Sequence, residues 1–120
     1  MNARAFNAFC RRLPATSHVV QWGGADVWKV GGKVFAVAWD QPPAPAITFK
    51  VSELAFEILR EQPGLRPAPY LASRGFKWIQ HYAKPGLSDA ELKDYLARSH
   101  ALVAAGLPKK TRRALGLEPA

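Results

Sequence analysis

The sequence predicts an α+β fold of two layers, in which helices cover an antiparallel β-sheet. Residues 28–39 read WKVGGKVFAVAW, and their Gly31-Gly32 pair can supply the positive φ angles that a two-residue hairpin turn requires. Residues 46–51 alternate as a further strand, and apolar residues recur at helical spacing near both ends of the chain. These patterns predict the order α-β(3)-α-β(2)-α, followed by a short basic C-terminal helix.

The first helix is predicted to follow Asn2, which can cap a helix, and to end before Pro14. Cys10 falls on its apolar stripe, so we expect a buried thiol rather than a nucleophile. A short β-like run, residues 18–22, comes before the hairpin. The apolar stripe of the helix comprises Phe6, Phe9, Cys10 and Leu13.

The period of two along the hairpin predicts which side chains share a face of the sheet. With the glycines at the turn, Val30 lies opposite Lys33 and Trp28 lies opposite Phe35. We expect one bulky face that forms a wall of the core, and a second face of small residues with one lysine. The bulky face comprises Trp28, Val30, Phe35, Val37 and Trp39, and the other face Val27, Lys29, Val34, Ala36 and Ala38.

Later elements are predicted from capping residues and alternation. Ser52 suits the start of a second helix, and residues 70–71 and 76–82 alternate as two further strands. Ser88 and Glu91 match the capping box S-x-x-E of a long third helix. The inner faces are predicted to be Leu54, Phe56, Ile58 and Leu59 in the second helix, and Leu92, Tyr95, Leu96, Ser99, Leu102 and Val103 in the third.

Charge is the most distinctive property of these 120 residues, which on length alone form a single domain, 1–120. The net charge is +8, and residues 62–88 and 107–113 contain cations and no carboxylate. The second of these stretches covers most of the predicted final helix, residues 108–115. Such clusters favour a polyanionic partner, although a solvated charged face would give the same composition.

The sequence indicates no catalytic residue, metal site or cofactor, and no small-molecule substrate is evident. The three histidines show no metal-ligand spacing with one another or with Cys10, the single cysteine. Gly31-Gly32-Lys33 does not fit a phosphate-binding loop, because Val27 and Val34 stand where that motif needs a glycine and a hydroxyl. With no signal peptide or membrane span in the sequence, we expect a cytoplasmic protein.

Five segments in order resemble the MmcQ/YjbR family. They are FxxFCxxLP at 6–14 (x being any residue), WG at 22–23, VWKVGGKVFA at 27–36, PAPYL at 67–71 and LPKK at 107–110. The resemblance runs from Phe6 to about Arg113. It implies the two-layer α-β(3)-α-β(2)-α fold and a DNA-binding role with a double-wing arrangement of hairpins.

The first functional hypothesis is therefore a non-enzymatic module that binds nucleic acid, with DNA as the expected partner. We expect the cations of the second hairpin and of the C-terminal tail to be neighbours. The alternative is a protein-interaction or adaptor domain with a secretion-chaperone-like fold, acting through Trp22, Trp39 or Tyr82. The predicted nucleic-acid-binding residues are Lys29, Lys33, Arg74, Lys77, Lys109, Lys110, Arg112 and Arg113.

Overall fold

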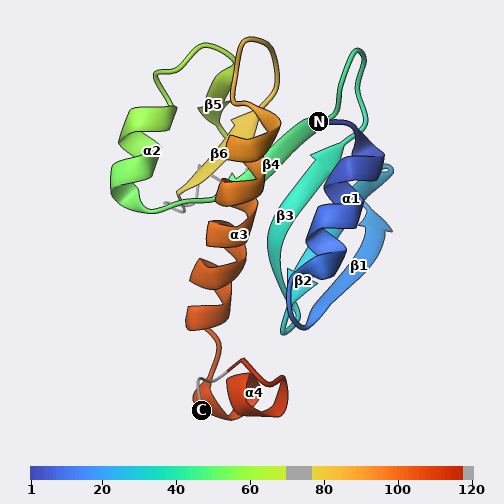
Figure 1. Cartoon of the computed structure of the whole chain (residues 1–120), viewed down its shortest axis with the longest axis vertical. Helices are drawn as coiled ribbons and strands as arrows, with labels where there is room; N and C mark the ends of the chain where they lie inside the picture. The colour runs from blue at the N-terminus through green and yellow to red at the C-terminus, as the bar shows by residue number, and fades with distance from the viewer. Residues whose placement is uncertain (70–76, 118–120) are drawn as a thin grey trace.

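The computed structural model of the chain describes residues 1–69 and 77–117. It confirms the α+β class, with a six-stranded antiparallel sheet and helices packed against it (Figure 1). The elements in chain order are α1 (Ala3–Arg12), β1 (Thr16–Gln21), β2 (Ala25–Val30), β3 (Lys33–Trp39), β4 (Ala46–Lys50), α2 (Glu53–Leu59), β5 (Leu65–Pro67), β6 (Trp78–His81), α3 (Asp89–Ala105) and α4 (Lys109–Ala114).

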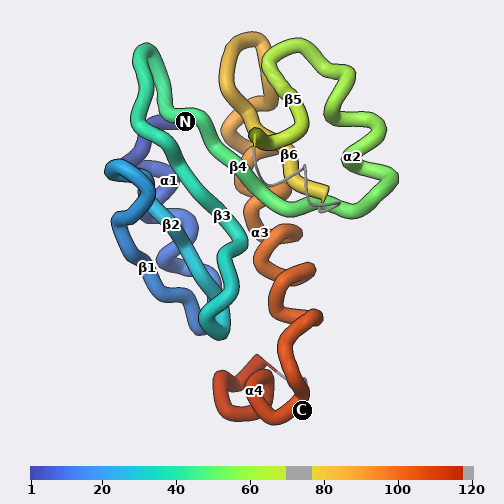
Figure 2. Tube along the Cα trace, turned by 180° about the vertical axis from the view of Figure 1, so that it is seen from behind, coloured from blue at the N-terminus to red at the C-terminus, as the bar shows by residue number. Residues whose placement is uncertain are grey.

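The sheet has the strand order β1-β2-β3-β4-β6-β5, with every neighbouring pair antiparallel. One face carries the main core, to which α1, α2 and α3 all contribute buried side chains. Figure 1 shows α1 and α3 in front of the sheet, and Figure 2 shows the strands from behind. A smaller apolar cluster from β2 and β3 alone lies on the other face, where Val27 and Val37 are buried.

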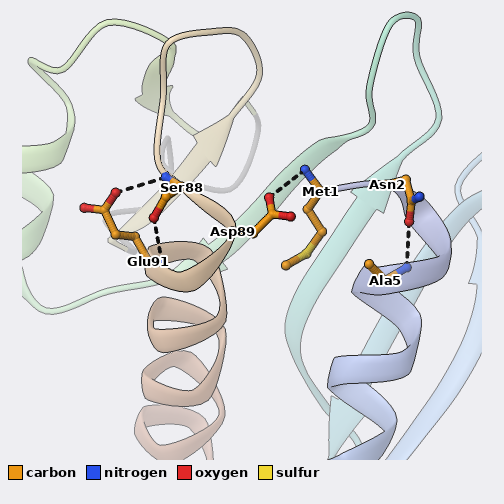
Figure 3. Close-up of polar contacts among 6 residues, drawn as sticks. All are labelled: Met1, Asn2, Ala5, Ser88, Asp89 and Glu91. Carbon is orange, nitrogen blue, oxygen red and sulfur yellow. Dashed lines mark hydrogen bonds and ion pairs between the residues drawn. The ribbon is translucent and has the colours of Figure 1, made fainter.

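Helix starts follow the predicted capping residues closely. Asn2 accepts a hydrogen bond from the backbone N–H of Ala5 at 2.8 Å, which caps α1. The hydroxyl of Ser88 accepts from the N–H of Glu91, and the Glu91 carboxylate accepts from the N–H of Ser88, so the capping box is complete (Figure 3). The amino group of Met1 lies 2.9 Å from the carboxylate of Asp89, which joins the starts of α1 and α3.

The predicted division of the hairpin into two faces is wrong beyond the turn, because β3 contains a bulge. Val30 does lie opposite Lys33, but Trp28 lies opposite Ala36 rather than Phe35. The extra residue makes Phe35 and Ala36 both part of the main core, and it reverses the alternation that follows. Ala36 and Ala38 therefore face the helices, whereas Val37 and Trp39 belong to the cluster on the opposite face.

Two further differences concern strands. Residues 16–21 pair with β2 along their whole length, so four strands rather than three come before α2. The strand before β6 is Leu65–Pro67, whereas the predicted strand at residues 70–71 lies outside the described residues. Both outcomes keep the fold class, since they only extend the same antiparallel sheet.

The predicted inner face of α2 is wrong in part. Phe56 and Leu59 are buried, but Leu54 and Ile58 are 73% and 55% exposed. A helix of seven residues can bury only a narrow stripe, and a pair at i, i+3 fills it. On α3 the predicted stripe holds for most positions, although Leu102 is exposed at 40%.

Candidate functional site

Cations from three separate segments lie at one end of the molecule, which we call the basic end. They come from the last turn of α1, from the β2–β3 turn and from α4. Figures 1 and 2 agree in placing these three segments at the same end of the fold. The residues of the basic end are Arg11, Arg12, Lys29, Lys33, Lys109, Lys110, Arg112 and Arg113.

The β2–β3 turn is held against the chain that leads into α4. Gly31 has a φ of +57°, and a Cβ built on it would lie 2.5 Å from Cδ1 of Leu107. Leu107 itself is buried, only 5% exposed, as part of the main core. This apolar contact fixes Lys33, two residues beyond Gly31, close to the start of the basic helix.

The end of α1 is joined to the same region through β1. Thr16 is paired with Val30, and its hydroxyl donates to the backbone carbonyls of Cys10 and Leu13 at 3.2 Å each. The guanidinium of Arg11 lies 5.3 Å from the ring centroid of Trp28, a cation–π contact between α1 and β2. Arg11 and Arg12 therefore border the β2–β3 hairpin near its turn.

The cations of the basic end differ in how freely they reach solvent. Lys29 is half-buried, and it alternates with the core residues Trp28 and Val30, so its side chain leaves the sheet on the opposite face. Arg112 is also half-buried and donates to the carbonyl of Ala105 at 3.2 Å, which supports the end of α3. The exposed cations are Arg11, Arg12, Lys33, Lys109, Lys110 and Arg113.

The described carboxylates lie elsewhere in the molecule. Asp26 and Asp40 are at the open end of the β2–β3 hairpin, away from its turn, and Asp26 pairs with His18 at 2.8 Å. Asp89 and Glu91 are in the first turn of α3, a helix of 17 residues. At 1.5 Å per residue, about 25 Å separates that turn from the end of α3 that leads to α4. The longest axis measures 40 Å, and the basic end lies at the end of it that holds cations without described carboxylates. The other end holds Asp89 and Glu91 together with cations such as Lys84 and Lys93.

The expected pairing of the second hairpin with the tail is not what the described residues show. Lys77 lies before β6, and its Nζ is 4.9 Å from the ring centroid of Phe56 on α2. It therefore packs against α2 rather than α4. Arg74 lies outside the described residues. The chain that leads into α4 instead contacts the turn of the first hairpin, where Leu107 packs against Gly31.

Sequence reasoning missed Arg11 and Arg12 as members of this cluster. Their position in the last turn of a helix is visible in the sequence, as the pair in FCRRLP. The pairing of β1 with β2 brings these two arginines to the β2–β3 turn. The sequence indicated only a short β-like run at residues 18–22, not a strand paired along its whole length. A predicted full-length β1 would have placed the end of α1 beside that turn.

The aromatic residues of the alternative hypothesis lie on other surfaces. Trp22 is 49% exposed and stacks on Trp39, with ring centroids 6.1 Å apart. Tyr82 is partly covered by Arg66, whose guanidinium lies 4.3 Å from the ring centroid. The stacked tryptophans form the most exposed aromatic feature among the described residues.

The single cysteine and the metal-ligating side chains show no catalytic arrangement within the described residues. Burial raises the pKa of the Cys10 thiol to about 12, so this cysteine stays protonated at neutral pH. Within residues 1–69 and 77–117, no three His, Cys, Asp or Glu side chains come together as a metal site would require. In the same ranges, no helix combines the length and apolarity needed to cross a bilayer.

Comparisons with known proteins place the chain among sequences of one family. Residues 11–102 match the family model described as YjbR. Over 90 residues the chain is 31% identical to uncharacterized protein YbdF of Escherichia coli O157:H7, which covers 73% of this chain and 71% of that protein.

Two solved structures are similar in fold. The Deinococcus radiodurans protein DR2400, a DUF419 domain, has a TM-score of 0.85 at 22% identity, covering 98% of this chain and 89% of that one. A protein from Pseudomonas syringae has a TM-score of 0.70 at 21% identity, covering 86% of this chain and 99% of that one. At these identities the likeness bears on the fold alone.

Proposed function

This chain belongs to the YjbR family, and we propose that it is a non-enzymatic module that binds nucleic acid, with DNA as its partner. The proposed binding surface is the basic end. The observation that carries the proposal is the gathering of cations from α1, the β2–β3 turn and α4 at one end, away from the described carboxylates. We also propose a cytoplasmic location, since a single cysteine can form no internal disulfide.

Electrostatics favours a polyanion as the partner of such a surface. A DNA duplex carries one phosphate charge about every 1.7 Å along its axis, so cations spread over three elements can meet several phosphates together. Contacts to phosphates fix the position of a protein on nucleic acid but carry no sequence information. We therefore expect binding with weak sequence preference.

The β2–β3 turn can approach a phosphate backbone closely. Its tip is Gly31-Gly32, which carries no side chain, and Lys29 and Lys33 flank it. β1 pairs with β2 as far as Val30, so the turn is part of the rim of the sheet rather than a free two-stranded ribbon. In this arrangement Lys33 and α4, which lies beside the turn, would contact phosphates on the outside of the duplex.

The test is a titration of a short labelled duplex, and of the matching single strand, at about 50 and 200 mM salt. Four to seven phosphate contacts predict a loss of affinity of about 10²- to 10⁴-fold between these salt concentrations. A higher affinity for the single strand would redirect the proposal to single-stranded nucleic acid. No binding to either at the lower salt would overturn it.

A pair of charge-matched variants then locates the surface. The first reverses Lys33, Lys109 and Lys110 to Glu, and the control reverses Arg4, Lys84 and Lys93 to Glu. All six side chains are exposed, and both variants lose the same six units of net charge. We expect the first to bind at least tenfold more weakly than the control at the same salt. Equal losses of affinity would mean that binding depends on the net charge of the protein and not on the location of the cations at the basic end.

The stacked pair of Trp22 and Trp39 supports the second candidate, a protein-interaction or adaptor domain. An exposed aromatic pair is typical of interface anchors, which bind through apolar burial and so resist salt. Trp22→Ala should leave nucleic-acid binding at the basic end unchanged. If nucleic-acid binding fails, a partner retained at high salt and lost on Trp22→Ala would favour this second function.

A further inference from the structure

The two edges of the sheet are unlike. At one edge β5 has three residues and contains Arg66 and Pro67, and both a short strand and a proline discourage further pairing. At the other edge β1 has six residues, Thr16–Gln21, that include no lysine, arginine, carboxylate or proline. The second edge therefore lacks the features by which proteins commonly block the addition of a strand.

The outer side of β1 is also open. β1 is the terminal strand of the sheet and pairs with β2 through all six residues, so a row of its backbone N–H and C=O groups points outward. Residues 17–20 are all exposed, with Val19 at 37% and Val20 at 58%. Figure 1 shows β1 at the margin of the sheet, with α1 over its face rather than along its edge.

We propose that β1 is a pairing edge for β1 of a second copy of this chain, which gives a two-fold antiparallel dimer with one continuous sheet. In such a pair, an odd-numbered residue faces an odd-numbered residue and an even-numbered residue faces an even-numbered one, with both side chains on the same side of the sheet. A two-fold axis at Val19 sets Val19 against its copy and His18 against Val20. An axis at Val20 sets Val20 against its copy and Val19 against Gln21.

The side chains of β1 suit its own copy as the occupant. Either register brings β-branched valines together across the new pair, which is among the favourable cross-strand combinations. Each copy carries a net charge of +8, so two copies repel each other. This repulsion is smallest where the strands that pair contribute no lysine or arginine, as is the case for β1. The carboxylate of Asp26, on the neighbouring strand, is already paired with His18. This proposal does not depend on nucleic-acid binding.

Sedimentation equilibrium of the full chain over a range of concentrations, at high salt, tests the proposal. The apparent mass should rise with concentration towards that of two copies, and salt should strengthen the dimer by screening like charges. Nucleic-acid binding has the opposite salt dependence, so the two proposals fail separately. A chain that stays monomeric at all concentrations overturns the dimer.

Matched variants locate the contact. Val20→Lys places like charges at the proposed edge and should weaken dimerisation at least tenfold. Ile58→Lys is the control, since Ile58 is similarly exposed at 55% but lies on α2. Dimerisation of the Val20→Lys variant at wild-type strength would contradict the proposal.

Cysteine variants give a direct readout of the register. Under mild oxidation Val19→Cys or Val20→Cys should form a linked dimer, whichever lies at the two-fold axis. The native Cys10 is buried and does not compete. Ile58→Cys is the control, since any linked dimer that it forms arises from random collisions between molecules. Linkage of Ile58→Cys as fast as the edge variants would exclude β1 as the contact.

Discussion

The hydroxyl of Ser99 donates a hydrogen bond to the backbone carbonyl of Phe35 at 2.6 Å. Phe35 is the extra residue of the bulge in β3, and the ladder between β3 and β4 has its last pair at Ala36 and Phe49. The same hydroxyl accepts from the backbone N–H of Lys50 at 2.8 Å. The side chain of Ser99 on α3 therefore bridges β3 and β4 by hydrogen bonds at the point where the pairing of the two strands ends.

Ser99→Ala should lower the free energy of unfolding by about 2–4 kcal/mol, because it leaves a carbonyl of β3 and an N–H of β4 without this partner in a largely buried place. Chemical denaturation measures the change. The control is Lys93→Ala, at an exposed position on α3, which should stay within about 0.5 kcal/mol of the wild type. A loss no larger than that of the control would mean that water replaces the hydroxyl.

Gly31→Ala should destabilise the protein by about 1–3 kcal/mol more than Gly32→Ala. Both glycines have positive φ, at +57° and +79°, so both substitutions strain the backbone. Only at Gly31 does the added Cβ meet Leu107, whereas nothing lies within 4 Å of the Cβ position at Gly32. Thermal or urea unfolding measures both variants. In a Leu107→Ala background the difference between the two should shrink, and an unchanged difference would contradict the contact.

Glu91 should titrate below the ordinary range of a glutamate. The backbone N–H of Ser88, and then its side chain, favour the ionised carboxylate and lower the pKa of Glu91. A carboxyl whose pKa is depressed by folding adds stability above its unfolded pKa, and that stability is lost as pH falls through the folded pKa.

Carbon-detected NMR titration of the Glu91 carboxyl checks this prediction. Glu91→Gln keeps an acceptor for the Ser88 N–H without the charge. The stability difference between the wild type and this variant should therefore be constant near neutral pH and change only in acid. A Glu91 pKa at the ordinary glutamate value would refute the prediction.

Cys10 should resist thiol reagents in the folded protein and react only on unfolding. Burial raises the pKa of its thiol to about 12, so the folded protein retains this proton where an unfolded thiol would lose it. Between those two pKa values the native state binds more protons, and stability should decline as pH rises above about 8.5. Denaturation at several alkaline pH values measures the decline. Cys10→Ala should remove that part of it, and native-state reactivity at neutral pH would contradict the burial.

Features that depend on neighbouring residues were predictable from the sequence. The caps at Asn2, Ser52 and Ser88 and the glycine turn of the hairpin are settled within a few residues, and the structure confirms them. The bulge at Phe35 was not predictable, because it arises when two consecutive residues both pack into the core. A strict alternation with a period of two places consecutive residues on opposite faces, so it cannot predict a position where two neighbours share one face.

The candidate site shows the same limit. The cations of α4 and of the first hairpin could be named from the sequence, but the approach of these two segments depends on Leu107 packing against Gly31. Arg11 and Arg12 join them only because β1 runs beside β2, which is a property of strand order. The exposure of Leu54 and Ile58 likewise reflects how little of the short α2 reaches the core.

The uneven distribution of charge along α3 gives the molecule an electric moment fixed to its shape. The strongly positive end lies at α4, whereas at the other end Asp89 and Glu91 offset cations such as Lys84 and Lys93. In the field of a polyanion such a body experiences a torque before any atoms touch. If nucleic acid is the partner, as proposed, molecules that approach it the wrong way round would rotate during diffusion, and a larger share of encounters would begin with the basic end towards the phosphates.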